Sequence, residues 1–396
     1  TCRSRWSLDT HVLGSPQPKG GAPLSITADL LTSGLAFVGC ALGSLRPTPP
    51  PTPETRRREV VVAGKRVKVI DVHSHWYPPE WLELVEKEAV DNGATKIERN
   101  ARGFMVISIP GLGVTFQPQY TDIPSRLKAM DEKGVAIHVM SLTQPMVYWA
   151  KPEFGLRLSQ AFNNACSELH KKYPERFLGL AMLPMQSPDM SIAELDRVSK
   201  LPGIKGAYMS THVLGKNLDD KSFWPVYEKC EALGFPIFLH PTNTLGADRM
   251  RNYYLRNFIG NPVESAIAAS SLMFSGVMDR YPKLDVVLPH AGGVFPSLLG
   301  RMTHGQTVRQ ELQDLPRPPM EYRRRFHYDT IAHDKDTLLN LVHQVGADRV
   351  VCGTDFPADM SDVAPVSTVE RMTELSTKDR DLILRGNAAR LLKLEG

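Results

Sequence analysis

The chain has 396 residues, 42% of them hydrophobic and 23% charged, a composition typical of a globular protein with a large core. The formal net charge is only +4, and the two short arginine runs are too small to predict nucleic-acid binding. The five cysteines are widely spaced and include no Cys-x-x-Cys pair, which argues against a disulfide framework and a thiolate metal site. Any bound metal is therefore expected to have histidine and carboxylate ligands.

Residues 1–65 differ from the rest of the chain and are interpreted as a leader, followed by one enzyme domain over residues 66–396. Leu30–Leu42 is apolar but too short to span a bilayer, and residues 47–53 form a proline-rich linker. The apolar segment resembles the core of an export signal, which leaves an exported or periplasmic protein open. We favour the other interpretation, a leader on a cytoplasmic enzyme without a membrane span.

From residue 66 onward, short apolar runs alternate with amphipathic windows. The runs lack polar alternation, as expected for parallel strands that are buried on both faces. The expected strands are Val67–Val72, Ala136–Leu142, Leu178–Leu183, Gly203–Met209, Phe235–Leu239, Leu284–Leu288, Phe326–Asp329 and Arg349–Cys352. The expected helices are Ile123–Glu132, Gly155–Lys172, Met190–Leu201, Ser222–Leu233, Pro262–Arg280, Phe295–Leu312 and Lys335–Val345.

Eight strands with intervening helices predict an α/β fold, a TIM (β/α)8 barrel. A doubly wound open sheet is the alternative, but no glycine-rich phosphate fingerprint follows the first strand. Residues 95–120 interrupt the alternation. They contain the apolar runs 104–110 and 114–118 around Gly111-Leu112-Gly113, which predicts a small β-hairpin insertion after strand 1.

Histidine and aspartate side chains follow several of the predicted strands. His73 and His75 end the first strand, and side chains two residues apart on a strand share one side. His240 follows the fifth strand and Asp355 the eighth. Because barrel closure brings strand ends together, these residues are expected to form a three-nitrogen, one-oxygen metal site. Such a site suits Zn²⁺, with Mn²⁺ or Fe²⁺ possible, and leaves a position open for water or substrate.

His290 follows the sixth strand and is expected to act as a general acid or base beside the metal, with Asp355 as a second catalytic candidate. His212 closes the fourth strand, where a substrate-binding role and a structural one are both open. His138 is expected in the core or behind the ligands. Lys205 precedes its strand end, which favours one metal ion over two.

Five segments of the chain resemble the amidohydrolase-related decarboxylases, and most closely the aminocarboxymuconate-semialdehyde decarboxylase family. They are IDVHSHWYPPEW, FLHPTNTLGADRM, LPHAGGVFPSLLGRM, PRPPMEYRRRFHYDT and VVCGTDFP. The resemblance extends from residue 68 to the C-terminus. It implies zinc at His73, His75, His240 and Asp355, with His290 as the catalytic histidine. It also implies a homodimer in which Arg301 of one subunit reaches a substrate carboxylate in the other.

Two departures from the family concern substrate recognition. Residues 113–122 lack the arginine that the family carries between the insertion and the second strand, and Thr242 replaces a tryptophan of the family's His-Pro-Trp motif. A second substrate carboxylate is therefore in doubt, although Arg249, Arg102 or Arg126 are candidates for the missing arginine.

These observations predict non-oxidative decarboxylation of a small unsaturated or hydroxyaromatic carboxylic acid. The same residues also permit a metal-dependent hydrolase of C–N, C–O or C–C bonds, because fold and metal do not fix the reaction class. A non-catalytic metal-dependent binding protein is the third possibility, and the acid–base histidine beside the ligands argues against it.

Overall fold

The computed structural model describes residues 57–394. The apolar segment and the proline-rich linker of the leader lie outside the described residues. The predicted domain boundary at residue 65 stays a prediction, and the described chain opens with a small hairpin of β1 (Val61–Val62) and β2 (Lys65–Arg66). Among residues 57–394, no helix combines the length and apolarity needed to cross a membrane.

Eight parallel strands form the centre of the domain, in the order β15-β14-β13-β12-β9-β8-β7-β3. Each strand of this sheet corresponds to a predicted one: β3 (Val69–His75), β7 (Val135–Ser141), β8 (Phe177–Met182), β9 (Ile204–Ser210), β12 (Ile237–His240), β13 (Val286–Leu288), β14 (Phe326–Asp329) and β15 (Val350–Val351). Almost all of their residues are buried, in agreement with the apolar runs that predicted them.

The sheet closes between its first and last strands. The backbone N–H of Val72 donates to the carbonyl of Cys352 at 2.9 Å, and Ser74 forms a parallel bridge with Phe356 just after β15. The predicted TIM barrel is therefore confirmed, and an open sheet is excluded.

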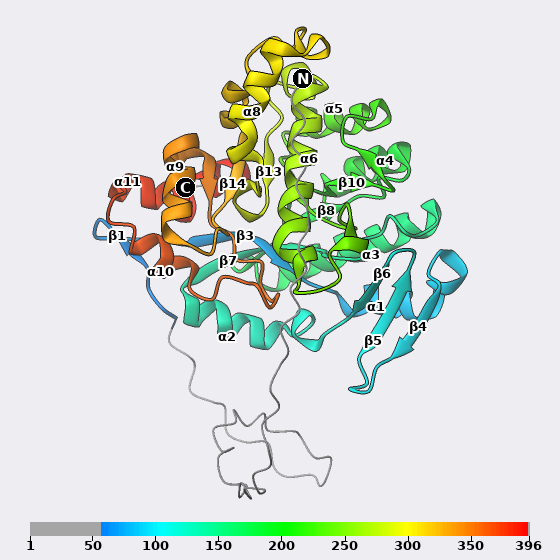
Figure 1. The fold of residues 1–396 in the computed structure, drawn as a ribbon. Helices are drawn as coiled ribbons and strands as arrows, with labels where there is room; N and C mark the ends of the chain where they lie inside the picture. The colour runs from blue at the N-terminus through cyan, green and yellow to red at the C-terminus, as the bar shows by residue number, and fades with distance from the viewer. Residues whose placement is uncertain (1–56, 395–396) are drawn as a thin grey trace, which may run out of the picture. The chain divides into compact units, whose positions relative to one another are not determined.

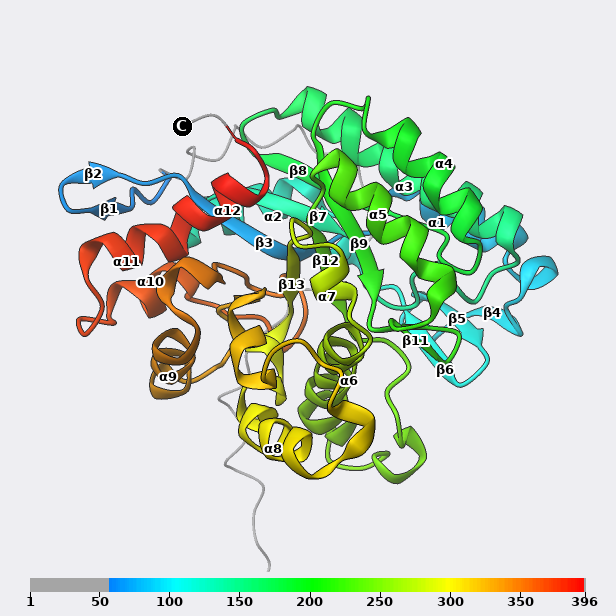
Figure 2. The ribbon, with the colours of Figure 1, turned by 90° about the horizontal axis from the view of Figure 1, so that it is seen from above.

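Helices surround the barrel strands, as seen from above in Figure 2. The α-helices are α1 (Pro79–Glu88), α2 (Ile123–Lys133), α3 (Pro152–Lys172), α4 (Pro188–Val198), α5 (Trp224–Leu233), α6 (Asn261–Phe274), α7 (Val277–Arg280), α8 (Phe295–Val308), α9 (Lys335–Val345), α10 (Pro365–Glu370), α11 (Thr377–Asp381) and α12 (Asn387–Leu391). Local sequence sets their ends. Asp122, for example, accepts a hydrogen bond from the N–H of Ser125 at the start of α2, and Gly134 ends that helix in a left-handed conformation.

The insertion is a three-stranded antiparallel sheet of β4 (Lys96–Arg99), β5 (Met105–Ile109) and β6 (Leu112–Thr115). The predicted hairpin is present as β5–β6, and β4 extends it by one strand. β4 escaped the sequence analysis because its residues, KIER, are mostly charged and exposed and show no apolar run. Figure 1 shows this sheet beside α1. The rings of Phe116 and Tyr77, 4.9 Å apart, connect the end of the insertion to the segment after β3.

Candidate metal centre and substrate cavity

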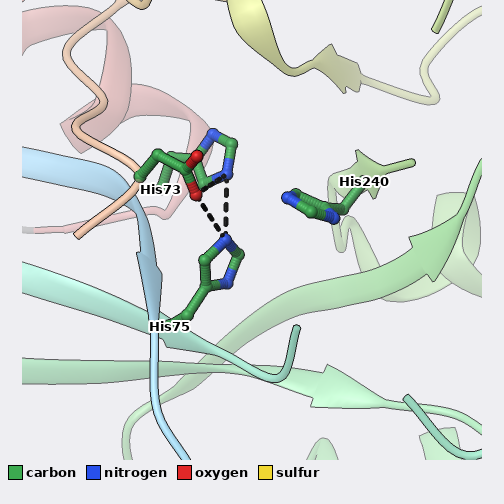
Figure 3. Close-up of side chains that lie close together, drawn as sticks. His73, His75 and His240 are labelled. Carbon is green, nitrogen blue, oxygen red and sulfur yellow. Dashed lines mark hydrogen bonds and ion pairs between the residues drawn. The ribbon is translucent and has the colours of Figure 1, made fainter. Parts of the chain in front are cut away.

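The four predicted metal ligands converge at the C-terminal end of the barrel. His73, His75, His240 and Asp355 each offer one ligand atom, and these atoms all lie within 4.8 Å of one another. The Nε2 atoms of His73 and His75 are 3.2 Å apart, and the Nε2 of His75 is 2.8 Å from Oδ1 of Asp355. Figure 3 shows His240 facing the other two histidines across a small gap. All four residues are buried.

Strand geometry accounts for this convergence. His73 and His75 both point into the barrel mouth because they alternate on β3 with Ser74, whose side chain bonds the carbonyl of Val139 on β7. Asp355 has a left-handed backbone (φ 63°), and its N–H donates to the carbonyl of His73 at 2.8 Å. That conformation is uncommon outside glycine. Here it turns the carboxylate back toward the histidines.

A hydrogen-bond partner fixes the second nitrogen of each imidazole. The Nδ1 atoms of His73, His75 and His240 lie 2.7 Å from Oδ2 of Asp329, 3.0 Å from Oγ of Ser141 and 3.0 Å from the carbonyl of Pro241, respectively. Such partners orient metal-ligating histidines and leave Nε2 free for the ion. The donor set and its supports therefore fit a divalent metal ion of the zinc, manganese or iron type.

Two carboxylates, those of Asp329 and Asp355, act on the cluster histidines, and their negative charge favours a bound cation. Burial opposes protonation of His73, but hydrogen bonds and charges from Asp329 and Asp355 outweigh it and raise the pKa of His73 to about 10. Burial lowers the pKa of His75 to about 4, although Asp355 opposes that shift. Burial of Asp355 is outweighed by hydrogen bonds from the histidines, which hold its pKa well below the usual range. In the metal-free protein the neighbouring carboxylates therefore favour the protonated form of His73, and burial favours the neutral form of His75.

Asp329, at the end of β14, was not singled out by the sequence analysis. Its carboxylate accepts four N–H groups: His73 Nδ1 at 2.7 Å, and the backbone N–H groups of His290, Ala291 and Ile331 at 2.8–3.0 Å. It thereby connects His73, a predicted metal ligand, to the turn that carries His290. Its position at a strand end, like that of the four predicted ligands, was the signal available in the sequence.

His290 lies beside the metal cluster. Its Nε2 is 3.7 Å from Oδ2 of Asp355, and its Nδ1 is buried without a hydrogen-bond partner among the described residues. His290 and Ala291 both have left-handed backbones (φ 53° and 56°). Gly293 (φ 59°) completes the turn, and a Cβ there would lie 2.3 Å from the carbonyl oxygen of Pro262. The turn requires glycine at this position.

Two cavities meet at the cluster. One, of about 350 Å³, is largely apolar and is lined by His290, Asp355, Phe258, Val294 and Ile331 among others. The other, of about 280 Å³, is more polar, and we call it the polar cavity. Its lining includes His75, Tyr77, Gln117, Tyr120, Gln144, His240, Tyr254, Asn257, Asp355 and Asp359. Together they offer room for a small acid next to the predicted ligands.

The structure brings none of the predicted substrate-binding residues into these two cavities within one chain. Arg301 is exposed on α8, and Arg249 is exposed in the segment after β12. His212 donates from Nε2 to the carbonyl of Thr242 at 2.9 Å and accepts at Nδ1 from the N–H of Gly215, contacts that stabilise two loops. The substrate-binding roles of all three stay predictions.

Two further arginine candidates also lie elsewhere. Arg102 is exposed in the insertion. Arg126 is buried behind β3, where it donates to the carbonyl of His75 and lies 4.8 Å from the ring centre of Phe356. His138 is buried as predicted, with Nε2 3.3 Å from Oδ2 of Asp71. Asp71 is a second residue that sequence reasoning missed. It accepts the N–H groups of His73 and Thr354 at 3.0 Å each and so connects the two segments that carry His73 and Asp355.

Comparison with known proteins agrees with this fold. Residues 70–394 match the amidohydrolase family. The chain is 36% identical to a 2-amino-3-carboxymuconate-6-semialdehyde decarboxylase of Dictyostelium discoideum over 82% of this chain and 92% of the relative. It is 32% identical to a gamma-resorcylate decarboxylase of Polaromonas sp. over 68% and 86% of the two chains.

A solved structure extends the comparison to the metal. A dihydroxybenzoic acid decarboxylase of Polaromonas sp., crystallised with manganese and the inhibitor 2-nitroresorcinol, superposes with a TM-score of 0.68 and 28% identity. The superposition covers 83% of this chain and 97% of the relative. The chain therefore belongs to the amidohydrolase family, and within it to the metal-dependent decarboxylases, as the sequence predicted.

Proposed function

We propose that the protein releases CO2 from a small hydroxyaromatic or unsaturated carboxylic acid, without oxidation. The observation that carries this proposal is the convergence of His73, His75, His240 and Asp355 beside His290, at the junction of two cavities. The decarboxylases among its relatives support the reaction class.

His73, His75, His240 and Asp355 would hold one metal ion. The three-nitrogen, one-oxygen donor set suits zinc, and manganese in the Polaromonas relative supports that ion as an alternative. When bound, the ion orients the acid and withdraws negative charge from it.

His290 is proposed to deliver the proton that the reaction consumes. The carbon that bears the carboxylate accepts a proton, the C–C bond breaks, and its electron pair stays on that carbon while CO2 leaves. His290 lines the larger of the two cavities, and its Nε2 lies 3.7 Å from Oδ2 of Asp355. It can therefore donate this proton to a substrate in that cavity and then recover a proton from solvent by way of Asp355. A well-placed acid of this kind contributes about 10²–10⁴-fold to the rate.

A homodimer is proposed because residues 57–394 of one chain place no basic anchor for the substrate carboxylate in the two cavities. The two cavities contain no lysine or arginine among the described residues. Arg301 is exposed on α8, next to a largely apolar groove of about 540 Å³ between α6 and α8. We propose that a second copy covers that groove and that Arg301 of the partner subunit then contributes to the site. The cytoplasmic location also stays a prediction, since the apolar leader segment lies outside the described residues.

Carboxyl-labelled acids test the reaction directly. Metal-loaded protein is expected to release labelled CO2 from hydroxybenzoates or unsaturated acids. When the reaction is run in deuterium oxide, one deuterium should appear on the carbon that lost the carboxylate. A hydrolase on the same scaffold would instead incorporate solvent oxygen into an acid or alcohol and release no CO2. A binding protein would retain the acid unchanged.

Subunit complementation tests the dimer. His290→Ala and Arg301→Ala chains, each inactive alone, are expected to recover about a quarter of native activity when co-expressed, because half of the dimers then contain one intact composite site. If Arg301 acts within its own chain, co-expression restores nothing, and if Arg301 has no role, the Arg301→Ala chain is already active alone. Sedimentation of each variant controls for loss of the dimer itself.

A further inference from the structure

The polar cavity has an unusual charge balance for a site that receives an acid. Its uncharged lining includes the phenols of Tyr77, Tyr120 and Tyr254 and the amides of Gln117 and Asn257. Its charged lining consists of two carboxylates, Asp355 at the metal cluster and Asp359 at the rim, together with the cluster histidines. No lysine or arginine among the described residues compensates Asp359 there.

Tyr254 fixes the position of Asp359. The phenol of Tyr254 donates to both carboxylate oxygens, at 2.9 Å and 3.0 Å, although the two residues lie 105 positions apart. To reach this position, Tyr253 and Tyr254 both adopt left-handed backbones (φ 57° and 59°), a costly conformation for aromatic residues. The bond therefore holds an exposed carboxylate at one place on the rim rather than leaving it free to rotate.

The charge of Asp359 acts on both sides of the polar cavity. Burial and the adjacent Asp359, together with Asp355, raise the pKa of Tyr254 to about 12. Burial, followed by the charges of Asp355 and Asp359, also raises the pKa of Tyr120, which comes from the segment after the insertion. An incoming anion would experience the same negative potential as these two phenols.

Resting on the proposed function, we infer that Asp359, positioned by Tyr254, makes the enzyme selective for acids with one carboxylate and hydroxyl substituents. The metal cluster and Arg301 of the partner subunit would compensate one carboxylate. A second carboxylate in the polar cavity would face Asp359 without a cation, and like charges brought together are a common device for rejecting a ligand. Phenols and amides on the lining instead suit neutral hydroxyl groups.

Binding measurements test this inference separately from catalysis. Dissociation constants are measured by calorimetry on the metal-loaded full chain. The ligands are salicylate and its analogues with a second carboxylate at each ring position in turn. The native protein is expected to bind salicylate at least about tenfold more tightly than any of the dicarboxylates.

Two substitutions at one position provide matched variants. Asp359→Asn removes the charge and keeps the shape, and it should shift the preference toward a dicarboxylate by at least about fivefold. Asp359→Glu keeps the charge and should leave the preference within about twofold of native. Tyr254→Phe frees Asp359 and should give an intermediate shift, with unfolding midpoints recorded for every variant.

Each outcome decides one of the two claims. A native preference for a dicarboxylate, no binding of any of these acids, or an equal shift in the Asn and Glu variants would overturn the role of Asp359. If the expected shift in binding is found but none of the bound acids loses CO2, the proposed decarboxylation fails while the selection against a second charge stands.

Discussion

Replacement of Asp329 by asparagine perturbs the predicted metal centre without replacing any of its four proposed ligands. Oδ1 of Asp329 accepts the N–H groups of Ala291 and Ile331, and Oδ2 accepts those of His73 and His290. An asparagine amide can present its NH2 group only in place of one of these oxygens. In either orientation, two buried donors face another donor and lose their acceptor.

The magnitude follows from those two lost acceptors. A buried donor without a partner costs about 1–3 kcal/mol, so Asp329→Asn should lower the free energy of unfolding by about 2–6 kcal/mol. If the amide nitrogen faces His73, that imidazole can restore the bond only by moving its proton to Nε2, the nitrogen that faces the ion. Metal affinity should therefore fall by about 10–100-fold.

Urea unfolding of the metal-free protein and competition with a chelating dye measure the two effects. Asp285→Asn is the matched control, because Asp285 also accepts from a buried histidine, His327, at 3.1 Å but is 42% exposed and remote from the cluster. Its cost should be about 1 kcal/mol or less. An Asp329→Asn protein with native metal affinity and a loss of stability no larger than that of the control would refute this reasoning.

Three further predictions follow from the same site. His290→Ala should reduce kcat by about 10²–10⁴-fold while the metal content stays native. The control His343→Ala, on the exposed face of α9, should leave kcat unchanged. Loss of metal in parallel with kcat would instead mark His290 as a ligand. The pKa of His73 is raised to about 10 and that of His75 is lowered to about 4, so at neutral pH His73 is expected as imidazolium and His75 as neutral imidazole. Metal binding at neutral pH should then release about one proton, from His73. Affinity should then rise about tenfold per pH unit between these limits, and calorimetry in buffers of different ionisation enthalpy detects the proton, whereas a pH-independent affinity would contradict the assignment. Gly293→Ala should lower the unfolding free energy by about 2–4 kcal/mol, since its Cβ would collide with the backbone of Pro262. The control Gly300→Ala on α8, where the Cβ meets open space, should be neutral or stabilising in thermal melts. Equal melting points of the two variants would contradict the steric role of Gly293.

The barrel and the convergence of the four proposed ligands were predictable because both depend on local patterns repeated along the chain. Buried parallel strands produce apolar runs, and residues at their C-terminal ends must meet once the barrel closes. His73, His75, His240 and Asp355 could therefore be selected by residue type and by their positions at strand ends, together with the family resemblance. β4 was missed because a charged, exposed strand carries no such pattern.

The residues that sequence reasoning could not assign act through partners that are distant in the chain. Asp329 gains its role from N–H groups on β3 and on the turn after β13. Tyr254 and Asp359 meet only because two loops cross the same rim, one of them in a left-handed conformation that tyrosine rarely adopts. His212 is the opposite case, a residue selected for its strand-end position that did not join the site. Both of its ring nitrogens form hydrogen bonds with neighbouring loops.

Titration of metal-stripped protein with zinc or manganese, with CO2 release followed at each addition, tests the central claim most directly. The proposed site of His73, His75, His240 and Asp355 predicts that activity rises in proportion to added metal and saturates at about one ion per chain, and that His240→Ala abolishes both binding and CO2 release. Full activity in metal-stripped protein, or a requirement for two ions per chain, would contradict it.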